Sequence, residues 1–473
     1  MLPALAAGRS ILPSPTRLAV GRHASSASPS LSPADSAAHS HRVVVVGAGS
    51  AGLTISHQLL RSRQFSQDEI ALVDPAAWHH YQPGWTLVGG GLEEKARLRR
   101  PLQDLISQRL KHYRHKVAAF YPDGNSIMLD DGRQIAYEHL VVAPGIELDY
   151  DSVKGLPQAL ADPDSPVSSI YGYEFCDKAF KTIKTLKKGT AVFTHPTGAV
   201  KCAGAPQKIM WLALDHWKKA GLYTYSPGSA AAAEDSPIRV KFATGMASLF
   251  GVPKYSAVLE QLRGQRGVDG YFQHDLVAIE GNQAVFNVAL PLPKGVAGGD
   301  GPEKATALTT RKLQFDLLHV VPKMGPYAFI KESTISDQAG YVDVDEATTR
   351  HRRYPNIWSA GDASSLPTSK TIAAITAQAP VLVHNMLKAM DGKTPDAVYD
   401  GYTSCPLLTE YGRVLLAEFK YGGEPSETFH RWFGTDQAVP RRAFYHLKKD
   451  FFPWVYYSSM VKGTWRGPKG WSV

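Results

Sequence analysis

The chain contains little cysteine and no long apolar stretch, and each shortage excludes a class of protein. Only three cysteines occur among its 473 residues, namely Cys176, Cys202 and Cys405. That number is too small for a disulfide scaffold, although it is enough for one redox pair. No apolar run approaches the roughly eighteen residues that a membrane-spanning helix needs. Zinc-finger, RNP and other nucleic-acid-binding signatures are also missing, so we expect no nucleic-acid partner.

Acidic residues are absent from the first 34 positions, which hold Arg9, Arg17 and Arg22 among many Ser and Ala. This composition is typical of a mitochondrial transit peptide. A disordered tail without a targeting role is the alternative. The rest of the chain is ordinary for a globular protein, with 44% hydrophobic and 20% charged residues. Its net charge of +9 favours anionic partners, such as phospholipid or an acidic cofactor.

Residues 41–74 predict a dinucleotide-binding unit. A β-branched run, Val43 to Val46, is typical of a strand buried on both faces. A helix is expected over about residues 50–61, then a strand over Ile70 to Val73 that ends in an acid able to bind a ribose. The G-x-G-x-x-G spacing between strand and helix allows a sharp turn, a close approach of pyrophosphate and close helix packing. These glycines are Gly47, Gly49 and Gly52, and the acid is Asp74.

The segment from residue 78 to residue 148 is expected to continue this unit. Residues 78–91 are rich in Gly, Pro and aromatics, so we predict a loop over a flat aromatic cofactor. Residues 96–115 form a basic stretch that we predict to be helical. Sheet strands are predicted at Val117–Phe120, Ser126–Leu129, Arg133–Tyr137 and from Leu140, the last ending in Ala143-Pro144-Gly145.

A second glycine motif is missing where a nicotinamide-binding domain would carry one. A strand at Ala191–Thr194 and a helix at Gln207–Ala220 are predicted, but their connection holds Pro196 and Cys202 instead. The second domain is therefore expected to keep the strand–helix order without a second dinucleotide. Residues 226–237 are predicted to be a low-complexity linker and residues 291–306 a flexible loop, with a strand at Phe315–Val321 after them.

A polar cluster near residue 362 indicates a flavin site. A strand over Asn356–Ala360 ends in Gly361-Asp362, and this aspartate is placed to bond a ribityl chain. Lys370 and a helix N-terminus near Thr371–Ala373 are placed to stabilise negative charge on a reduced isoalloxazine. An Asx turn that caps a helix is the alternative.

The cysteines differ in their surroundings. Cys202 precedes a helix predicted to begin at Pro206, and the helix dipole with Lys201 and Lys208 favours its thiolate. Cys405 is predicted to lie in a loop held by Gly401 and Pro406, whereas Cys176 lies in a helical pattern without an activating cluster. Either loop cysteine taken alone is more often a packed or idle thiol, and Cys176 is expected to be structural.

Residues 441–473 interleave basic residues with Phe, Tyr and Trp, and Asp450 is their only acid. We expect Pro453 to split the segment into two short amphipathic pieces that lie in a lipid headgroup region. A basic helix pair packed on its own domain is the alternative.

Four segments together resemble the mitochondrial sulfide:quinone oxidoreductase family from about residue 41 onwards. They are HHYQPGWTLVG, VKCAGAPQKIMWL, HRRYPNIWSAGDASSLPTSKT and DGYTSCPLLTEYGRVLLAEF. The resemblance implies an α/β fold with two Rossmann-like dinucleotide-binding domains and a C-terminal membrane-associating region. It places a transit peptide at 1–40, the FAD-binding domain at 41–154 and 321–400, the second domain at 155–320 and the C-terminal region at 401–473.

The resemblance also implies the chemistry. Cys202 and Cys405 would form a redox-active disulfide that hydrosulfide attacks at Cys405, and non-covalent FAD would carry the electrons to ubiquinone at the inner mitochondrial membrane. Glutathione or sulfite would accept the sulfane sulfur. An NADH:quinone oxidoreductase of the same fold and a flavin-bearing redox sensor are the alternatives. The expected FAD contacts are Gly47, Gly49, Ser50, Ala51, Gly52, Asp74, Gln82, Val117, Ala143, Gly145, Asp362, Lys370, Thr371, Ile372 and Ala373.

Overall fold

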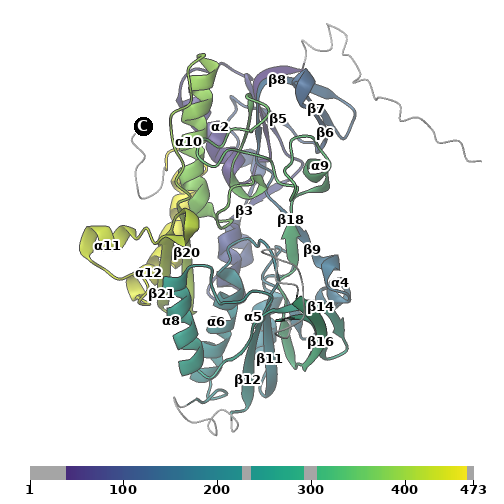
Figure 1. Cartoon of the computed structure of the whole chain (residues 1–473), viewed down its shortest axis with the longest axis vertical. Coiled ribbons are helices and arrows are strands. Elements are labelled where there is room, and N and C mark those ends of the chain that lie inside the picture. Colours follow the sequence, from purple (N-terminus) through teal and green to yellow (C-terminus); the bar gives the residue numbers. More distant parts are fainter. Residues whose placement is uncertain (1–38, 226–235, 292–305, 466–473) are drawn as a thin grey trace, which may run out of the picture.

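Two sheets, the first mixed and the second parallel, lie toward opposite ends of the long axis of the protein in the computed structural model (Figure 1). The structure describes residues 39–225, 236–291 and 306–465. Nearly all of the predicted transit peptide and most of the two predicted linkers lie outside these residues. The residue limits of the predicted domains stay a prediction.

The first sheet has seven strands in the order β5-β2-β1-β8-β7-β6, and β19 also pairs with β8. The predicted valine run is confirmed as a buried central strand, and the predicted helix and second strand have the expected limits. Helices α2 and α10 pack together beside this sheet. The bounds are β1 Ser40–Val46, α2 Ser50–Arg61, β2 Ile70–Val73, β5 Lys111–Tyr113, β6 Val117–Tyr121, β7 Ser126–Leu129, β8 Gln134–Val142, β19 Ile357–Ser359 and α10 Ile372–Met390.

Strand β8 positions the site because two strands share one of its edges. Its first half pairs with β7, whereas its second half pairs in parallel with β19, with Ser359 opposite Val142. On the other edge, Val46 of β1 also lies opposite Val142. Three parallel strands therefore end at the same level. The loops that follow them, which begin at Gly47, Ala143 and Ala360, leave the sheet at one edge.

The second sheet is entirely parallel, in the order β10-β17-β11-β12-β13. Its core includes the buried faces of α5 and α6. The predicted strand before Cys202 and the helix after it are confirmed. The bounds are β10 Val167–Ser168, α5 Lys178–Thr185, β11 Gly189–His195, α6 Ala205–Lys219, β12 Ile238–Thr244, α8 Pro253–Gln265, β13 Asp269–Tyr271 and β17 Leu317–His319.

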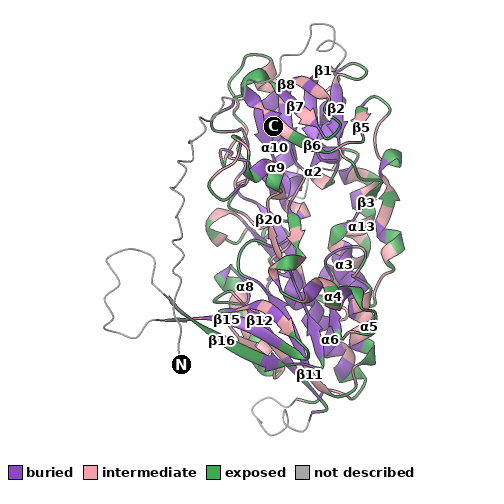
Figure 2. Ribbon diagram, turned by 90° about the vertical axis from the view of Figure 1, so that its right-hand side faces the viewer, coloured by how far each residue is buried: buried purple, intermediate pink, exposed green. Residues whose placement is uncertain are grey.

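Smaller elements surround and connect the two sheets. An antiparallel sheet of β14, β15 and β16 extends to one side of the second sheet, where Figure 2 shows β16 largely exposed. The pair β9 and β18 lies between the two halves, and the hairpin of β20 and β21 packs on α6. The bounds are β9 Glu147–Asp149, α4 Leu156–Ala161, β14 His274–Glu280, β15 Gln283–Pro291, β16 Thr306–Gln314, β18 Lys323–Gly325, α9 Ala328–Lys331, β20 Thr403–Glu410 and β21 Arg413–Phe419.

Two of the predictions for residues 78–115 are wrong. The predicted basic helix is instead two 3₁₀ turns and two short strands, because Pro101 lacks a backbone donor and Arg99–Pro101 pairs with Trp78–His80 as β4 and β3. The predicted aromatic loop contains β3, a 3₁₀ turn at Gln82–Gly84 and the short helix α3, Trp85–Gly89.

The C-terminal segment remains helical across Pro453, so the predicted split is also wrong. Helix α12 (Arg442–His446) runs through a π-helical turn (Leu447–Phe451) into α13 (Phe452–Val455) and a second π-helical turn (Tyr456–Met460). The wider π turn before the proline leaves room for its ring and needs no i−4 bond there. None of the helices in the described ranges is long and apolar enough to span a membrane.

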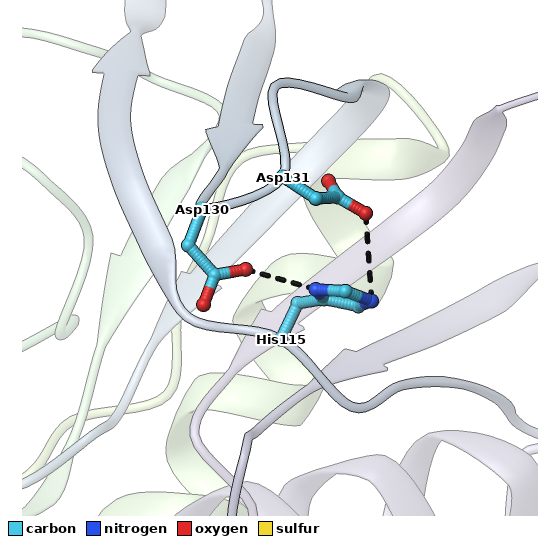
Figure 3. A group of neighbouring side chains, drawn as sticks. All are labelled: His115, Asp130 and Asp131. Carbon is cyan, nitrogen blue, oxygen red and sulfur yellow. Dashed lines mark hydrogen bonds and ion pairs between the residues drawn. The ribbon is translucent and has the colours of Figure 1, made fainter.

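A surface ion-pair cluster pins the turn between β7 and β8 (Figure 3). His115 Nδ1 lies 2.8 Å from an Asp130 carboxylate oxygen, and its Nε2 lies 3.5 Å from Asp131. Arg133 Nε donates to Asp131 over 2.6 Å. Because the carboxylates are exposed, water and salt screen these pairs and each contributes little to stability. We therefore assign the cluster a local role in this turn.

Candidate active site

One cavity of about 690 Å³ collects most of the predicted cofactor residues. It runs from the glycine turn before α2, past Cys202, to the C-terminal helical segment. Its walls come from the three strand ends that share the sheet edge, from the N-terminus of α10 and from the turn before α6. The predicted residues in its lining are Gly49, Ser50, Ala51, Gln82, Ala143, Gly145, Asp362, Lys370, Thr371, Ile372, Ala373 and Cys202.

In the glycine turn, Gly49 leaves room for a ligand, whereas Gly47 and Gly52 allow the backbone to pack closely. A Cβ on Gly52 would lie 1.8 Å from the carbonyl oxygen of Gly47, and Gly47 itself has φ +95°. A Cβ on Gly49 would meet nothing within 4 Å, so its open side faces the cavity. Gly49 is also the N-cap of α2, and it has no side chain to cap the helix. The first backbone N–H groups of α2 therefore stay available to an anion.

Four predicted contact residues do not line the cavity, although each lies close to the turn or in the sheet below it. Gly47 and Gly52 shape the turn, as described. The Asp74 carboxylate accepts the N–H of Ala48 over 2.6 Å, so it holds the turn to the end of β2. Val117 lies on β6, buried in the sheet core. Their contact with a cofactor stays a prediction.

Two half-buried lysines also border the cavity. Lys370 Nζ donates to the Ser364 carbonyl over 2.6 Å, and burial lowers the pKa of Lys370 to about 8. Lys201 Nζ donates to the side chain of Gln82 over 3.1 Å. The half-buried Asp362 interacts with the charges of both lysines, and desolvation raises its pKa although both lysines act in the opposite direction. This cluster of mixed charge is suited to polar groups of a flavin.

The N-terminus of α10 faces the same cavity. Thr371 is its N-cap, and its hydroxyl accepts the N–H of Ala374 over 3.0 Å. Ile372 and Ala373, the first two residues of the helix, line the cavity. The positive end of the helix dipole is therefore directed at this space, as predicted.

Cys202 and Cys405 meet at the cavity wall from distant parts of the chain. Their sulfur atoms lie 3.0 Å apart as free thiols, and Lys208 Nζ donates to Cys202 Sγ over 3.1 Å. Cys202 has φ +56°, a left-handed conformation held by its N–H bond to the Lys370 carbonyl. Such strain is typical of functional sites. Cys405 lies on strand β20, so the prediction that it occupies a loop is wrong.

The pair is electrostatically asymmetric. The hydrogen bond from Cys405, with the charge and hydrogen bond of Lys208, lowers the pKa of Cys202 well below its usual range despite burial. The bond to Cys202 and burial raise the pKa of Cys405. Burial opposes the charge of Lys208, yet the two sulfurs raise its pKa. These shifts favour the thiolate at Cys202 over Cys405.

Cys176 is remote from this pair. It is buried in the core beside α2 and β1, and burial raises its pKa to about 12. A neutral, buried thiol is inert toward oxidants and disulfides. The structure therefore agrees with the structural role expected for it.

Comparisons with known proteins show which family has this sequence and fold. Residues 41–186 match the model of the pyridine nucleotide-disulphide oxidoreductase family. The chain is 44% identical to the mitochondrial sulfide:quinone oxidoreductase of Schizosaccharomyces pombe, covering 91% of this chain and 92% of that protein. It is 37% identical to the mitochondrial enzyme of the same name from Mus musculus, covering 90% and 88%. The chain belongs to the mitochondrial sulfide:quinone oxidoreductase family. The crystal structure of the sulfide:quinone oxidoreductase from Aquifex aeolicus has the same fold, with a TM-score of 0.66 at 16% identity over 88% of this chain and 92% of that one.

As a member of this family the protein is an FAD-dependent enzyme, and its cavity fits that cofactor. The open side of Gly49 and the uncapped start of α2 suit the pyrophosphate. Asp362, Lys370 and the N-terminus of α10 supply the polar groups that the isoalloxazine end needs. The predicted fold class is also confirmed for the two Rossmann-like sheets.

Two residues of the site in this sulfide:quinone oxidoreductase family member were not predicted from the sequence. Lys448 is buried in the cavity wall and donates to the Pro83 carbonyl over 3.0 Å, and burial with repulsion by Lys208 lowers its pKa to about 7. Tyr456 is buried against the glycine turn. Both lie in the basic aromatic segment, where a lysine or tyrosine is normally a surface residue. The π-helical turns are the only local irregularity that marks these two residues, and no sequence pattern predicts such turns.

Proposed function

We propose that this protein oxidises hydrogen sulfide and reduces ubiquinone, with Cys202 and Cys405 as its redox pair. The observation that carries the proposal is the sulfur contact of 3.0 Å beside Lys208, in the wall of the cavity that fits FAD. The expected FAD residues of the sequence analysis are proposed as its contacts, Ser50 through its backbone N–H, with Gly47, Gly52, Asp74 and Val117 acting from outside the cavity lining.

The first step opens a Cys202–Cys405 disulfide. Hydrosulfide attacks Cys405 Sγ, the new sulfur–sulfur bond makes Cys405 a persulfide, and Cys202 leaves as a thiolate. The low pKa of Cys202 supports this direction, because a sulfur of lower pKa is the better leaving group. Lys208 remains protonated and stabilises the charge on the leaving sulfur.

The second step removes the sulfane sulfur. A small nucleophile, glutathione or sulfite, attacks the outer sulfur of the persulfide, so that the Cys405 thiolate leaves. When bound, FAD supplies a two-electron carrier between the reduced cysteine pair and the quinone. Loss of two electrons from the pair re-forms the disulfide. Lys208 and Lys448 lie close enough to the sulfurs to favour the thiolates throughout.

We infer that the quinone enters from a lipid surface at the C-terminal end of the cavity. Phe451 and Phe452 line this end, and Trp432 lines it while remaining 53% exposed. Phe433, beside it on α11 (Thr428–Phe433), is 72% exposed, and Trp454 on α13 is 64% exposed. Exposed aromatics around an opening are typical of monotopic membrane contact. The inner mitochondrial membrane is the proposed location.

Point substitutions test the lipid contact better than a truncation would. Removing residues after 440 would also remove Lys448 and Tyr456 from the cavity wall. We therefore expect the F433S/W454S double variant to lose most of its cosedimentation with cardiolipin-containing vesicles. Leu308→Ser, which is 71% exposed on β16 in the other half of the molecule, is the matched control. Equal sedimentation of both variants would exclude this surface.

An anaerobic titration of the purified protein tests the electron donor. Sulfide, without quinone, is expected to bleach the flavin or to produce a long-wavelength band, while NADH in a parallel sample leaves the spectrum unchanged. The turn between β11 and α6 supports this expectation, since Cys202 there is bonded to Lys370 and no second glycine motif is present in the sequence. Bleaching by NADH alone would assign the protein to the dehydrogenase alternative.

A further inference from the structure

Tyr456 connects the C-terminal segment to the glycine turn through a chain of hydrogen bonds. Its hydroxyl lies 2.6 Å from Ser50 Oγ and 2.6 Å from His79 Nε2. His79 Nδ1 lies 3.0 Å from the Ala48 carbonyl oxygen. Ser50 is the first residue of α2 and lines the cavity, so the chain of bonds reaches the place where the pyrophosphate fits.

The direction of each bond in this chain is determined. The Ala48 carbonyl only accepts, so His79 Nδ1 carries the proton and donates it. Burial lowers the pKa of His79 to about 4, so the ring is neutral and its Nε2 accepts. The Tyr456 hydroxyl therefore donates to His79, and its oxygen accepts the hydrogen of Ser50. The Ser50 hydroxyl is thus committed to Tyr456.

The bond from Ser50 to Tyr456 keeps the backbone N–H groups at the N-terminus of α2 available to a ligand. A serine in the first turn of a helix can bend back to the free backbone N–H groups and compete for them. With its hydroxyl held by Tyr456, Ser50 leaves those groups to the phosphates. We infer that Tyr456 is a positioning residue for FAD, which couples the seating of the C-terminal segment to cofactor binding.

Specific contacts fix the position of the C-terminal segment on α2. Two side chains along one face of α2 donate to consecutive carbonyls after Tyr456, namely His57 Nδ1 to Val461 (2.5 Å) and Arg61 Nε to Lys462 (2.8 Å). The Thr54 hydroxyl donates to the Ser50 carbonyl over 2.7 Å and lies 3.3 Å from the Met460 carbonyl. Gly463 lies so close to α2 that a Cβ would be 2.7 Å from the Gln58 nitrogen. The register of the segment on α2 is thereby fixed, and with it the position of the Tyr456 hydroxyl.

The affinity of the apo-protein for FAD, measured by fluorescence titration, tests the inference. It rests on the FAD site of the proposed function, but a failed sulfide assay leaves this readout untouched. Tyr456→Phe is expected to raise the Kd for FAD about tenfold, the order expected for one lost buried hydrogen bond. Tyr457→Phe, which removes a bond to the Leu98 carbonyl, is the matched control and should change it less than about twofold.

Ser50 gives a second test that does not depend on the folding of Y456F. Ser50→Ala removes the competing hydroxyl, so it should change the Kd less than about threefold, and Y456F in the S50A background should add little. A tenfold loss in S50A alone would mean that the serine binds FAD directly. That result, equal effects of Y456F and Y457F, or additive effects in the double variant would each overturn the inference.

Discussion

Replacing Lys208 by methionine should slow the reduction of the flavin by sulfide. The ammonium donates to Cys202 Sγ over 3.1 Å, and Lys208 is buried while Cys202 is half-buried. A hydrogen bond to a charged group contributes about 1.5–3 kcal/mol, and one factor of ten in rate corresponds to about 1.4 kcal/mol. We therefore expect Lys208→Met to be about 10- to 150-fold slower at pH 7. The loss arises because Cys202 becomes a poorer leaving group.

Anaerobic stopped-flow measurements of flavin bleaching at saturating sulfide would measure this rate. Removal of the cation raises the pKa of Cys202, so the variant should recover part of its rate between pH 7 and pH 9. Lys208→Arg keeps the charge and should lose less. Lys219→Met, on the same helix and with an exposed ammonium that pairs with Asp215, is the control for helix stability. A rate for K208M within about threefold of the wild type at pH 7 would refute the reasoning.

Three further results are expected. Cys405→Ser should lower sulfide-dependent quinone reduction at least about 1,000-fold, whereas Cys176→Ser should stay within about twofold in the same assay. Gly52→Ala should lower the free energy of unfolding by about 3 kcal/mol, because its Cβ would overlap the Gly47 carbonyl, while Gly49→Ala should weaken FAD binding and leave the apo-protein stable in thermal melts. Lys448 has a folded pKa of about 7 and an unfolded pKa near 10.5, so the unfolded state binds more protons between those values. Between pH 7 and pH 10 the free energy of unfolding of the wild type should therefore rise by up to about 1.4 kcal/mol per pH unit relative to that of Lys448→Met. Urea midpoints that change equally with pH in the two proteins would contradict this.

Local signals in the sequence predicted the parts of the site that are set by backbone geometry. The spacing of Gly47, Gly49 and Gly52 fixed the turn, and the structure shows a distinct steric reason at each position. The proline at residue 206 and the lysines beside Cys202 predicted a thiolate at a helix N-terminus. These features depend on residues within a few positions of one another, so a sequence carries them directly.

Features that depend on distant contacts were missed or misplaced. The basic stretch at 96–115 has helical composition, but pairing with Trp78–His80 and the proline at 101 make it strand and turn. Cys405 lies on a strand because Ala417 pairs with it. Lys448 has the sequence surroundings of a surface lysine. Only packing of the C-terminal segment over the cavity buries it, and no local pattern encodes that packing.

The bond between Ser50 and Tyr456 also has a consequence for the biogenesis of the protein. Its two partners are 406 positions apart, so the glycine turn is synthesised early and Tyr456 is synthesised very late. Chains emerge from the ribosome N-terminus first, and the first sheet can form before Tyr456 exists. Incorporation of FAD is then a late event. A chain that stops shortly before Tyr456 would complete both sheets and still hold its cofactor poorly.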